Sequence, residues 1–544
     1  MHIRIINIIA ILTILFFNPI YSQQQAPRYK EGELLVKFEG NINVRNVLSE
    51  TEFREMNVDI IRYFPHLGIW HLKIDESKRS DAEVLSQIRR DNRVVNVQFN
   101  HFVTLRRSKS SSEPNDEFFE EQWSLNNTGQ TGGTSGVDIS ALNAWNITTG
   151  NNGLTALGDE IVIAVIDDGF DLEHEDLDFT SKTYNAYIDS EDPDDIPVEN
   201  HGTHVSGIIG AIGNNETGIA GVMWDAKILP VAGSSLEEAT VLAAYDYVLG
   251  LRKEYNNTNG QAGKYIVATN SSFGIDYGDP EDFPLWCAAY DSLGVHGILN
   301  VAATMNQNVN VDEVGDVPSA CSSSYLISVT NTDHNDNLNA AYGLTTVDLG
   351  APGTNIFSTL TGDNYGLRTG TSFASPHVTG TIGLIYSILP ASELNKDNLP
   401  LQIKSWILNS VDLVSSLENE TVSGGRLNAY EAIIKALDLK ITGPIQVCGP
   451  TEYDIINTEE LPSDFNVSWS WSPQSALVET TGCEEGDHGL CVMDNDPSRF
   501  VNITANISHP DWHEDIEITK EDDIWAGTPT PIIQGPMVNG HEKA

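Results

Sequence analysis

Five apolar runs rich in β-branched residues constrain the fold of this chain more than any other feature of the sequence. They lie at residues 161–166, 227–231, 266–269, 298–302 and 326–329. Runs of this kind, the first without a polar break, are typical of strands buried on both faces of a parallel sheet. Helical patterns lie between them, for example at residues 237–251. The alternation predicts an α/β domain with a doubly wound, mostly parallel sheet, which we place at residues 115–440.

Length and charge narrow the class of protein. At roughly 150 residues per domain, 544 residues predict three or four folded units. With 30 Lys and Arg against 77 Asp and Glu, the formal net charge is −47, and a surface this acidic repels nucleic acid. An aromatic content of 8% and the long apolar runs exclude a disordered polyanion. The composition fits a globular extracellular protein, and its carboxylates suit Ca²⁺, whose ligands are oxygen atoms.

The N-terminus has the pattern of an export signal. A basic start at residues 1–4 precedes an almost wholly apolar stretch at residues 5–17, and Ser22 stands before a polar run of glutamines. This predicts a secretory signal at residues 1–22. The alternative is a membrane anchor, but the stretch is shorter than the roughly 20 residues that span a bilayer, and no other segment is long enough. We therefore expect a secreted protein in which disulfides are permitted.

A small unit precedes the α/β domain. Residues 23–107 contain short strand patterns, one of which places Val95, Val97 and Phe99 on the same face. A helical pattern between the strands has Arg89 in its last turn. The segment predicts a small α+β domain.

The regions at the two boundaries of the α/β domain differ in kind. Residues 108–114 form a polar, serine-rich linker that we expect to be exposed and cleavable. Residues 441–527 show strand patterns between turn signals and predict a β-sandwich. This segment opens with Ile-Thr-Gly-Pro, and the similar sequence Ile-Gln-Gly-Pro occurs at residues 533–536. We therefore expect residues 528–544 to begin a further repeat that is cut short. The alternative is coincidence.

Three short motifs in the α/β domain bear residues suited to catalysis. Asp167 ends the first apolar run, and open α/β sheets bind ligands at the carboxyl ends of their strands. His201 and Gly202 open an apolar helix, where a glycine permits close approach of another chain segment. Ser372 opens a second apolar helix, beside unpaired N–H groups that stabilise a developing oxyanion. Singly, such residues are commonly loop positions or helix caps.

Together and in this order, Val165-Ile166-Asp167-Asp168-Gly169, His201-Gly202-Thr203-His204 and Gly370-Thr371-Ser372-Phe373 resemble the subtilisin-like serine proteases, the subtilases of peptidase family S8. The resemblance covers residues 115–439. It implies an endopeptidase that hydrolyses protein substrates through an acyl-enzyme, with Ser372 as nucleophile, His201 as base and Asp167 as its orienting partner. His204 is then a helix residue, and His377 follows Ser372 too closely to serve as the base.

The resemblance also implies residues that bind the substrate. The family places an oxyanion-binding Asn after a buried strand, usually preceded by Gly, and Asn306 falls at this position with Met305 in place of the Gly. A methionine there is strained if the backbone needs a positive φ, and Asn308 and Asn310 are the alternatives. The segment Ser272-Phe273-Gly274 matches the family's Ser-Leu-Gly, whose backbone pairs with extended substrate, the alternative being an ordinary sheet edge.

For cofactors, the resemblance implies structural Ca²⁺ and no catalytic group. One ligand position of the family falls on an aspartate nine residues after Asp167, its calcium loop on residues 214–219, and the N-terminal ligand of some members on Pro114-Asn115-Asp116. The expected ligands are therefore Asp116, Asp176, Asn214, Asn215, Thr217 and Ile219. The alternative is a solvated acidic surface, which we expect for the acidic run at residues 189–195.

Two disulfides are expected among the five cysteines. Cys287 and Cys321 flank the Asn306 region, and Cys483 and Cys491 are spaced to close a hairpin, which leaves Cys448 over. The alternative is buried free thiols.

By the same resemblance, residues 23–107 correspond to the propeptide of the family, an intramolecular inhibitor whose tail occupies the cleft until autocleavage in the linker; the alternative is a permanent accessory domain. Residues 441–527 resemble Ig-like repeats of secreted proteins in Bacteroidetes-type bacteria. They are expected to anchor, space or bind substrate, including contact with a cell surface or matrix.

Two other functions compete with an active protease. A non-catalytic peptide-binding or adhesion module could keep this fold; the intact Asp167, His201 and Ser372 oppose it and Met305 favours it. An esterase with the same three residues is opposed by the absence of a Gly-x-Ser-x-Gly elbow at Ser372.

Overall fold

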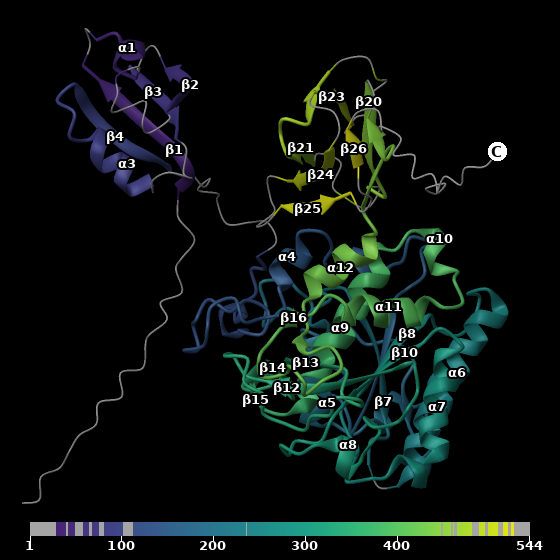
Figure 1. The fold of residues 1–544 in the computed structure, drawn as a ribbon. Helices are drawn as coiled ribbons and strands as arrows, with labels where there is room; N and C mark the ends of the chain where they lie inside the picture. Colours follow the sequence, from purple (N-terminus) through teal and green to yellow (C-terminus); the bar gives the residue numbers. More distant parts are fainter. Residues whose placement is uncertain are drawn as a thin grey trace, which may run out of the picture. The chain divides into compact units, whose positions relative to one another are not determined.

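The computed structural model of the protein separates into two compact units, Met1–Ser108 and Lys109–Ala544, each described here by itself (Figure 1). The predicted export signal, most of the linker, Cys448 and the predicted further repeat lie outside the described residues. No helix in the described part of the chain has the length and apolarity needed to cross a membrane. The structure describes residues 29–39, 42–48, 50, 58–64, 68–74, 81–101, 113–235, 237–447, 450–458, 461, 465–480, 483, 489–495, 499–509, 515–520 and 524–526.

The first unit is an antiparallel sheet in the order β2-β3-β1-β4, with helix α3 packed on it. Leu34, Val36 and Leu72 from the sheet and Ile88 from the helix form its core. The strands and helices are β1 (Tyr29–Phe38), α1 (Val44–Leu48), β2 (Asp59–Phe64), β3 (Ile69–Lys73), α3 (Asp81–Ile88) and β4 (Val94–His101).

Two details of this unit differ from the sequence prediction. Helix α3 ends at Ile88, so Arg89 lies just after the helix and not in its last turn. Val95 is 55% exposed, whereas Val97 is buried. A register shift explains this, because Lys37 pairs with Asn96 while the next residue, Phe38, pairs with Val94. Val95 is thus the unpaired extra residue of a bulge, and the bulge turns its side chain away from the core.

The second unit is built on a nine-stranded sheet in the order β16-β17-β13-β12-β10-β8-β5-β7-β6. Every described pair in it is parallel except β16 with β17. This agrees with the predicted mostly parallel α/β sheet. The strands are β5 (Val162–Asp167), β6 (Tyr184–Asn185), β7 (Lys227–Ala232), β8 (Ile266–Ser271), β10 (Leu299–Ala303), β12 (Leu326–Thr332), β13 (Leu349–Pro352), β16 (Asp412–Leu413) and β17 (Gly425–Arg426).

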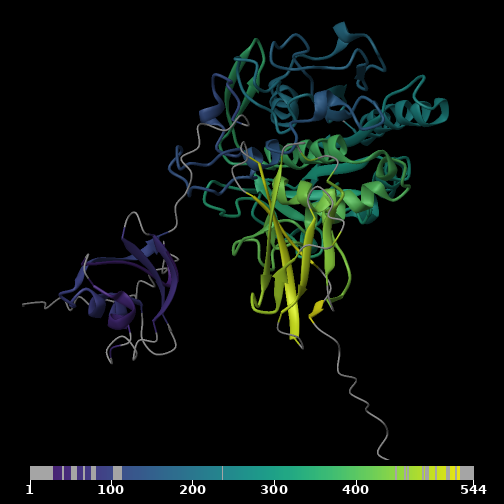
Figure 2. The same cartoon turned by 90° about the horizontal axis from the view of Figure 1, so that it is seen from above.

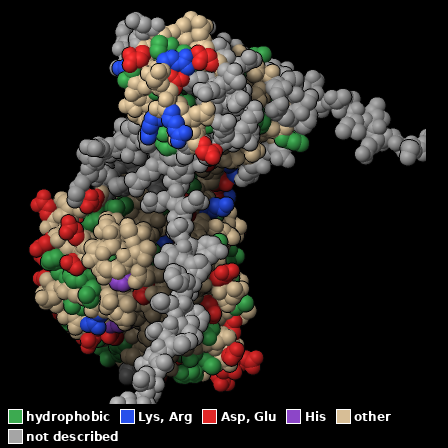
Figure 3. Space-filling model, turned by 60° about the vertical axis from the view of Figure 1, so that its left-hand side comes forward, with side chains coloured by type: hydrophobic (Ala, Val, Ile, Leu, Met, Phe, Trp, Pro, Cys, Tyr) green, Lys and Arg blue, Asp and Glu red, His purple; other side chains and the backbone are tan. Residues whose placement is uncertain are grey.

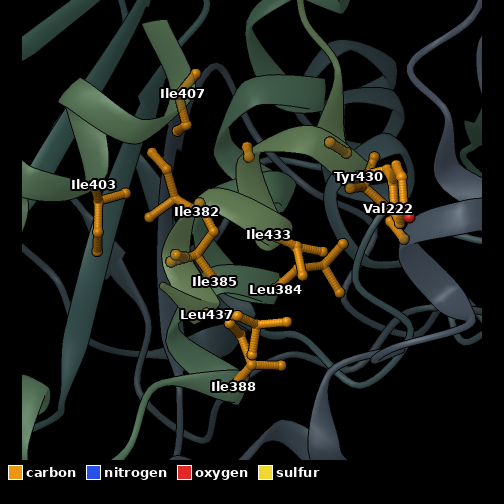
Figure 4. Packing of buried hydrophobic residues seen from close by; sticks show 14 of the residues in the cluster. Val222, Ile382, Leu384, Ile385, Ile388, Ile403, Ile407, Tyr430, Ile433 and Leu437 are labelled. Carbon is orange, nitrogen blue, oxygen red and sulfur yellow. The ribbon is translucent and has the colours of Figure 1, made fainter. Parts of the chain in front are cut away.

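The sheet is covered on both faces, as the apolar runs require. Along β5, Ile163 and Val165 belong to one buried cluster and Val162 and Ala164 to another. The first cluster includes residues of helices α5 (Asn200–Gly210), α9 (Ser375–Ile388), α11 (Leu399–Leu408) and α12 (Ala429–Leu437). Figure 4 shows part of this packing, with the isoleucines of α9 among side chains of α11 and α12. The second cluster includes residues of α6 (Glu238–Thr258) and α7 (Pro284–Gly294).

Shorter elements complete this part of the unit. The hairpin of β14 and β15 packs on α5, and β9 pairs with β11. The bounds are α4 (Ala141–Trp145), β9 (Ile275–Asp276), α8 (Val311–Val314), β11 (Asp316–Val317), β14 (Ile356–Leu360), β15 (Asn364–Arg368) and α10 (Ala391–Leu394). On the face shown in Figure 3, acidic side chains are spread over the surface and basic ones are few, in keeping with the net charge.

The segment after α12 forms two further sheets, β18-β20-β23-β22 and β19-β26-β24-β21, with β25 beside β24 (Figures 1 and 2). Burial alternates along β21, as expected for strands with one covered face. The strands are β18 (Lys440–Thr442), β19 (Gln446–Val447), β20 (Thr451–Ile456), β21 (Asn466–Ser472), β22 (Leu477–Glu479), β23 (Leu490–Asp494), β24 (Arg499–Ser508), β25 (Ile516–Thr519) and β26 (Ile524–Ala526).

Both expected disulfides are confirmed. Cys287 is bonded to Cys321, with a Cα–Cα distance of 5.2 Å, and Cys483 is bonded to Cys491, with a Cα–Cα distance of 5.9 Å. The first links α7 to the segment after β11, so the covalent loop contains β10 and the whole of the Asn306 region.

Candidate active site

Three elements bring Asp167, His201 and Ser372 to one edge of the large sheet. Asp167 is the last residue of β5, and His201 lies in the first turn of α5. Ser372 lies in the 3-10 turn η5 (Thr371–Phe373), which leads directly into α9. The site thus lies at the carboxyl end of a central strand, where sheets of this class bind ligands.

Asp167 and His201 form a close hydrogen-bonded pair. Nδ1 of His201 lies 2.7 Å from Oδ1 of Asp167. The aspartate is 1% exposed, whereas the imidazole keeps 30% of its side-chain surface in solvent. The approach depends on Gly202, because a Cβ at this position would lie 2.3 Å from the carbonyl oxygen of Gly169. The glycine of this motif is therefore required by close packing of α5 against the loop after β5.

The residue after Ser372, Phe373, packs against His201, and Ser372 itself is bonded to Ser272. The Phe373 ring centroid lies 5.4 Å from that of His201 and 4.5 Å from that of His204. The Ser372 hydroxyl donates to the carbonyl oxygen of Ser272 at 3.2 Å, and the Ser272 hydroxyl donates to the carbonyl oxygen of Ser372 at 2.8 Å. Catalytic hydrogen bonds commonly align only when substrate is bound, so this orientation is compatible with a serine that His201 activates.

The electrostatics single out His201 among the three nearby histidines. Burial opposes the protonated form of His201, but the adjacent Asp167 carboxylate outweighs it, and the pKa is raised above the usual 6.5. Burial lowers the pKa of His204 to about 3 and that of His377 to about 4. Both are neutral rings bound to backbone carbonyls, of Gly366 and Phe373 respectively. They are structural residues of their helices, as expected from the motifs.

Asp168 adds a second carboxylate to this cluster. One carboxylate oxygen of Asp167, one of Asp168 and one ring nitrogen of His201 lie within 4.8 Å of one another. Burial raises the pKa of Asp168 to about 6, and the charge of Asp167 adds to the effect. When ionised, Asp168 in turn helps to raise the pKa of His201.

Replacing Asp168 with asparagine is expected to move the acid limb of the pH profile of kcat/KM to lower pH. This limb reports protonation of the base in the free enzyme, and a base must be neutral to accept a proton. Since the Asp168 charge favours the imidazolium of His201, removing the charge lowers the His201 pKa. Casein hydrolysis measured over about pH 5–9 tests this. The control is Asp194→Asn in the exposed acidic run; a limb that stays in place or rises contradicts the expectation.

Asn306 lies next to the turn that bears Ser372, just after β10. Its Oδ1 accepts hydrogen bonds from the backbone N–H of Thr371, at 2.9 Å, and from the Thr371 hydroxyl, at 3.2 Å. Because the side-chain oxygen is engaged in this way, the Nδ2 group of the exposed amide is the part left to face a ligand. Of the alternatives, Asn310 caps the short helix α8.

The strain considered for Met305 is absent. Met305 is not among the residues with positive φ. Its side chain is 4% exposed and packs in a small apolar cluster with Val311, Ala341 and Val347. A methionine in place of the family's glycine therefore anchors this loop to the domain without distorting it.

Ser272, Phe273 and Gly274 connect β8 to β9. In the described structure these three residues belong to neither strand, so their backbone is not paired within the sheet. A Cβ on Gly274 would lie 2.4 Å from the carbonyl oxygen of Val317, which explains the glycine. The segment lies beside Ser372 through the Ser272–Ser372 bonds, and its pairing with substrate stays a prediction.

The residues expected to bind Ca²⁺ are brought together from three segments. Asp116 Oδ2 accepts a hydrogen bond from the N–H of Asn214, at 2.7 Å. Asp176 accepts from the Asn215 side chain, at 2.9 Å, and from the N–H of Ile219, at 3.0 Å. Thr217 donates its N–H to Oδ1 of Asn215, at 2.8 Å.

This cluster is short of positive charge. Burial raises the pKa of Asp116, and burial together with the charge of Asp116 raises the pKa of Asp176 to about 7. Oδ1 of Asp116 is buried and has no hydrogen-bond partner among the described residues. Two ionised buried carboxylates with an unsatisfied oxygen are costly in free energy, and a bound cation would offset this cost as protonation does. The donor set of carboxylate, amide and carbonyl oxygens is the one Ca²⁺ takes, so the residues fit this ion.

Two residues near the site were given no role from the sequence. Asp168 could have been found from its position beside Asp167. Asp316, a buried carboxylate that contacts the Asn306 loop, follows Asn306 by ten residues, and no motif in a single sequence marks it.

Comparison with known proteins places this chain in a family. The Subtilase family model matches residues 158–430. A thermophilic serine proteinase of Bacillus sp. (strain AK1) is 28% identical over 417 residues, covering 74% of this chain and 88% of the relative. Thermitase of Thermoactinomyces vulgaris is 30% identical over 304 residues, 54% of this chain and 93% of the relative. An extracellular protease of Xanthomonas campestris pv. campestris is 27% identical over 403 residues, 66% of this chain and 63% of the relative. The chain belongs to the subtilase family of serine proteases.

Proposed function

We propose that the protein is a secreted serine endopeptidase with Asp167, His201 and Ser372 as its catalytic triad. The observation that carries the proposal is the 2.7 Å contact between His201 and the buried Asp167, with Phe373 packed against the same imidazole. A basic, partly exposed imidazole beside a serine at a helix start is the arrangement that activates a hydroxyl for acyl transfer.

In this mechanism Oγ of Ser372 attacks the carbonyl carbon of a peptide bond, and its proton passes to Nε2 of His201. Asp167 holds the Nδ1–H tautomer and stabilises the imidazolium. The Ser372 N–H and Nδ2 of Asn306 donate to the oxyanion of the tetrahedral intermediate. His201 then gives the proton to the leaving amine, which leaves an acyl-enzyme on Ser372. A water, deprotonated by His201, hydrolyses the ester.

The unpaired backbone at residues 272–274 supports extended binding of the substrate. A peptide that adds to this segment as a strand places its scissile carbonyl next to Ser372, because Ser272 already contacts Ser372.

A fluorophosphonate, which phosphonylates activated serines, tests the proposed function. The expected result is a gain of one phosphonyl group per chain, located by peptide mass at Ser372, with loss of casein hydrolysis in proportion to labelling. The contrary result is casein hydrolysis that survives full labelling, or a label on another residue.

The other domains are proposed to serve the catalytic unit. Residues 23–107 act as a propeptide that inhibits the enzyme until the chain is cleaved in the linker at residues 108–114. Residues 441–527 act as an Ig-like β-sandwich that anchors or spaces the enzyme, for which their two described sheets offer support. The export pattern, the disulfides and the extracellular relative support action outside the cell.

We also propose that Asp116, Asp176 and the 214–219 loop hold a structural Ca²⁺. Chelation with EDTA is then expected to lower Tm on the order of 5–10 °C, since an ion at 100 times its Kd stabilises the fold by about 2.7 kcal/mol. Scanning calorimetry of the full chain measures this. Added Ca²⁺ should restore Tm, and Mg²⁺ should not, because it demands a tighter octahedral shell. Asp116→Asn should abolish the response and Asp194→Asn should keep it; a Tm that EDTA leaves unchanged contradicts the site.

A further inference from the structure

We propose that Asp316 is a positioning residue that orients Asn306 for oxyanion binding; this rests on the proposed function of Asn306. Asp316 is the first residue of β11 and is 2% exposed. It is a buried ionisable group near the site for which the mechanism above has no use, and its carboxylate reaches the loop that bears Asn306.

The carboxylate fixes the peptide group that joins Thr304 to Met305. Oδ2 of Asp316 accepts a hydrogen bond from the Met305 N–H, at 3.0 Å, and another from the Ser319 hydroxyl, at 2.5 Å. Met305 immediately precedes Asn306, so this bond constrains the backbone from which the amide side chain extends.

Asp316 is itself held against the large sheet. The carbonyl oxygen of Ser319 accepts a hydrogen bond from the Ser328 hydroxyl on β12, at 2.5 Å, and the carbonyl oxygen of Asp316 accepts from the N–H of Ala320, at 2.8 Å. β11 also pairs with β9, which follows the segment at residues 272–274. The position of the carboxylate is therefore set by rigid elements and not by the loop that it holds.

Thr371 holds the same loop from the opposite side. Its hydroxyl donates to the carbonyl oxygen of Thr304, and its N–H donates to Oδ1 of Asn306. Thr371 and Asp316 therefore bind the same peptide group, Thr371 at its carbonyl oxygen and Asp316 at its N–H. The Met305 side chain adds an apolar anchor. Because this peptide group is hydrogen-bonded at both its N–H and its carbonyl oxygen, the backbone of the next residue, Asn306, has little freedom. Preorganised oxyanion binding requires such a fixed donor.

The negative charge of Asp316 strengthens its hydrogen bond to the Met305 N–H. A carboxylate forms shorter and stronger bonds to backbone N–H groups than a neutral acceptor does. Burial raises the pKa of Asp316 to about 6, so the group is ionised at neutral pH. Without it the buried Met305 N–H loses its acceptor and the loop can shift, and a displacement of about 1 Å in a catalytic group costs on the order of 10²-fold in rate.

A double-mutant cycle in the full chain tests the proposal. Asn306→Ala is expected to lower kcat on casein about 10²–10³-fold. Asp316→Ala should lower kcat on the order of 10–10²-fold with KM little changed, and should cause no further loss beside Asn306→Ala. All rates are normalised to active sites by fluorophosphonate titration. A residue that merely supports the fold would lower the rate by the same factor in both backgrounds.

Two further variants keep the test decisive. Asp316→Asn keeps an acceptor oxygen but loses the charge. We expect a smaller loss in kcat than for Asp316→Ala, and no loss when Asn306 is already alanine. If Asp316→Ala does not fold, Asp316→Asn replaces it in the double-mutant cycle. Asp138→Asn is the matched control. Asp138 is also buried and accepts backbone N–H groups, from Asn127 and from Ser140 at 2.8 Å each, and neither partner belongs to the Asn306 loop or to the segment that holds Asp316. It should change Tm and not kcat.

The outcomes separate the two proposals. If Asn306→Ala leaves kcat unchanged, the oxyanion role of Asn306 is wrong. If Asn306→Ala lowers kcat but the Asp316→Ala factor is the same in both backgrounds, Asn306 keeps its role and the positioning role of Asp316 is wrong.

Discussion

Replacing Ser372 with alanine is expected to lower kcat on casein about 10⁶-fold, because loss of the nucleophile alone removes nearly all that the triad contributes. The residual rate, about 10³–10⁴ above that in water, would come from the oxyanion donors and substrate binding. The fold should be unaffected, since the Ser372 hydroxyl makes a single recorded bond, to the Ser272 carbonyl, that water can replace.

Ser375→Ala is the matched control for this prediction. Ser375 is the first residue of α9, is fully buried, and its hydroxyl lies 3.0 Å from that of Ser272. It should keep casein hydrolysis close to that of the wild type. Intact mass adds a second readout, because Ser372→Ala should retain the first hundred or so residues that the active enzyme sheds if processing is autocatalytic. Casein digestion by purified Ser372→Ala at the wild-type rate would show that another group is the nucleophile.

Asp167→Asn is expected to lower kcat about 10⁴-fold. The change hardly alters shape, but an asparagine can present its amide N–H to Nδ1 of His201, which forces the proton to Nε2 and leaves no base toward Ser372. It also removes the charge that raises the His201 pKa, so the imidazolium formed during attack loses its partner. Initial rates of casein hydrolysis at the plateau of the pH profile measure the loss.

Asp168→Asn is the natural comparison, because it makes the same chemical change one residue away. We expect it to keep the plateau rate and alter only the acid limb. Equal losses for the two variants would mean that the two carboxylates act as one unit, and the assignment of Asp167 as sole partner of His201 would be wrong.

The large sheet was predictable because its strands are buried on both faces, which favours long apolar runs, as along β5. Local features that depend on pairing partners were not. The exposed Val95 follows from the register of β4 against β1, and a register shift leaves no signal in a run of alternating residues. Helix α3 ends at Ile88, one residue before the Arg89 that the pattern placed in its last turn. Helix α6 runs to Thr258, well beyond the predicted residue 251, and stops at Asn259 in a left-handed conformation.

At the candidate active site, the sequence motifs located Asp167, His201 and Ser372 but not the contacts that hold the neighbouring Asn306 loop. Met305 was interpretable only through its φ. The contacts that surround its backbone come from Asp316, Thr371 and an apolar cluster, and no motif in the sequence marks them. With the strain absent, the one feature that favoured a non-catalytic module no longer does so. The contacts made by Thr371 likewise lie across 65 residues of chain, and a motif search cannot find them.

The bond between Cys287 and Cys321 makes the assembly of the catalytic centre depend on the redox chemistry of the place where the chain folds. It closes a loop of 34 residues, which in a chain-entropy model restricts the unfolded state by about 4 kcal/mol, and that loop contains both Asn306 and Asp316. Chains that remain in a reducing cytoplasm would fold without this crosslink. The loop that bears Asn306 would then be less constrained. With the export proposed above, oxidation would then constrain the loop that bears Asn306 and Asp316, so a host that makes the protein for study should offer an oxidising compartment.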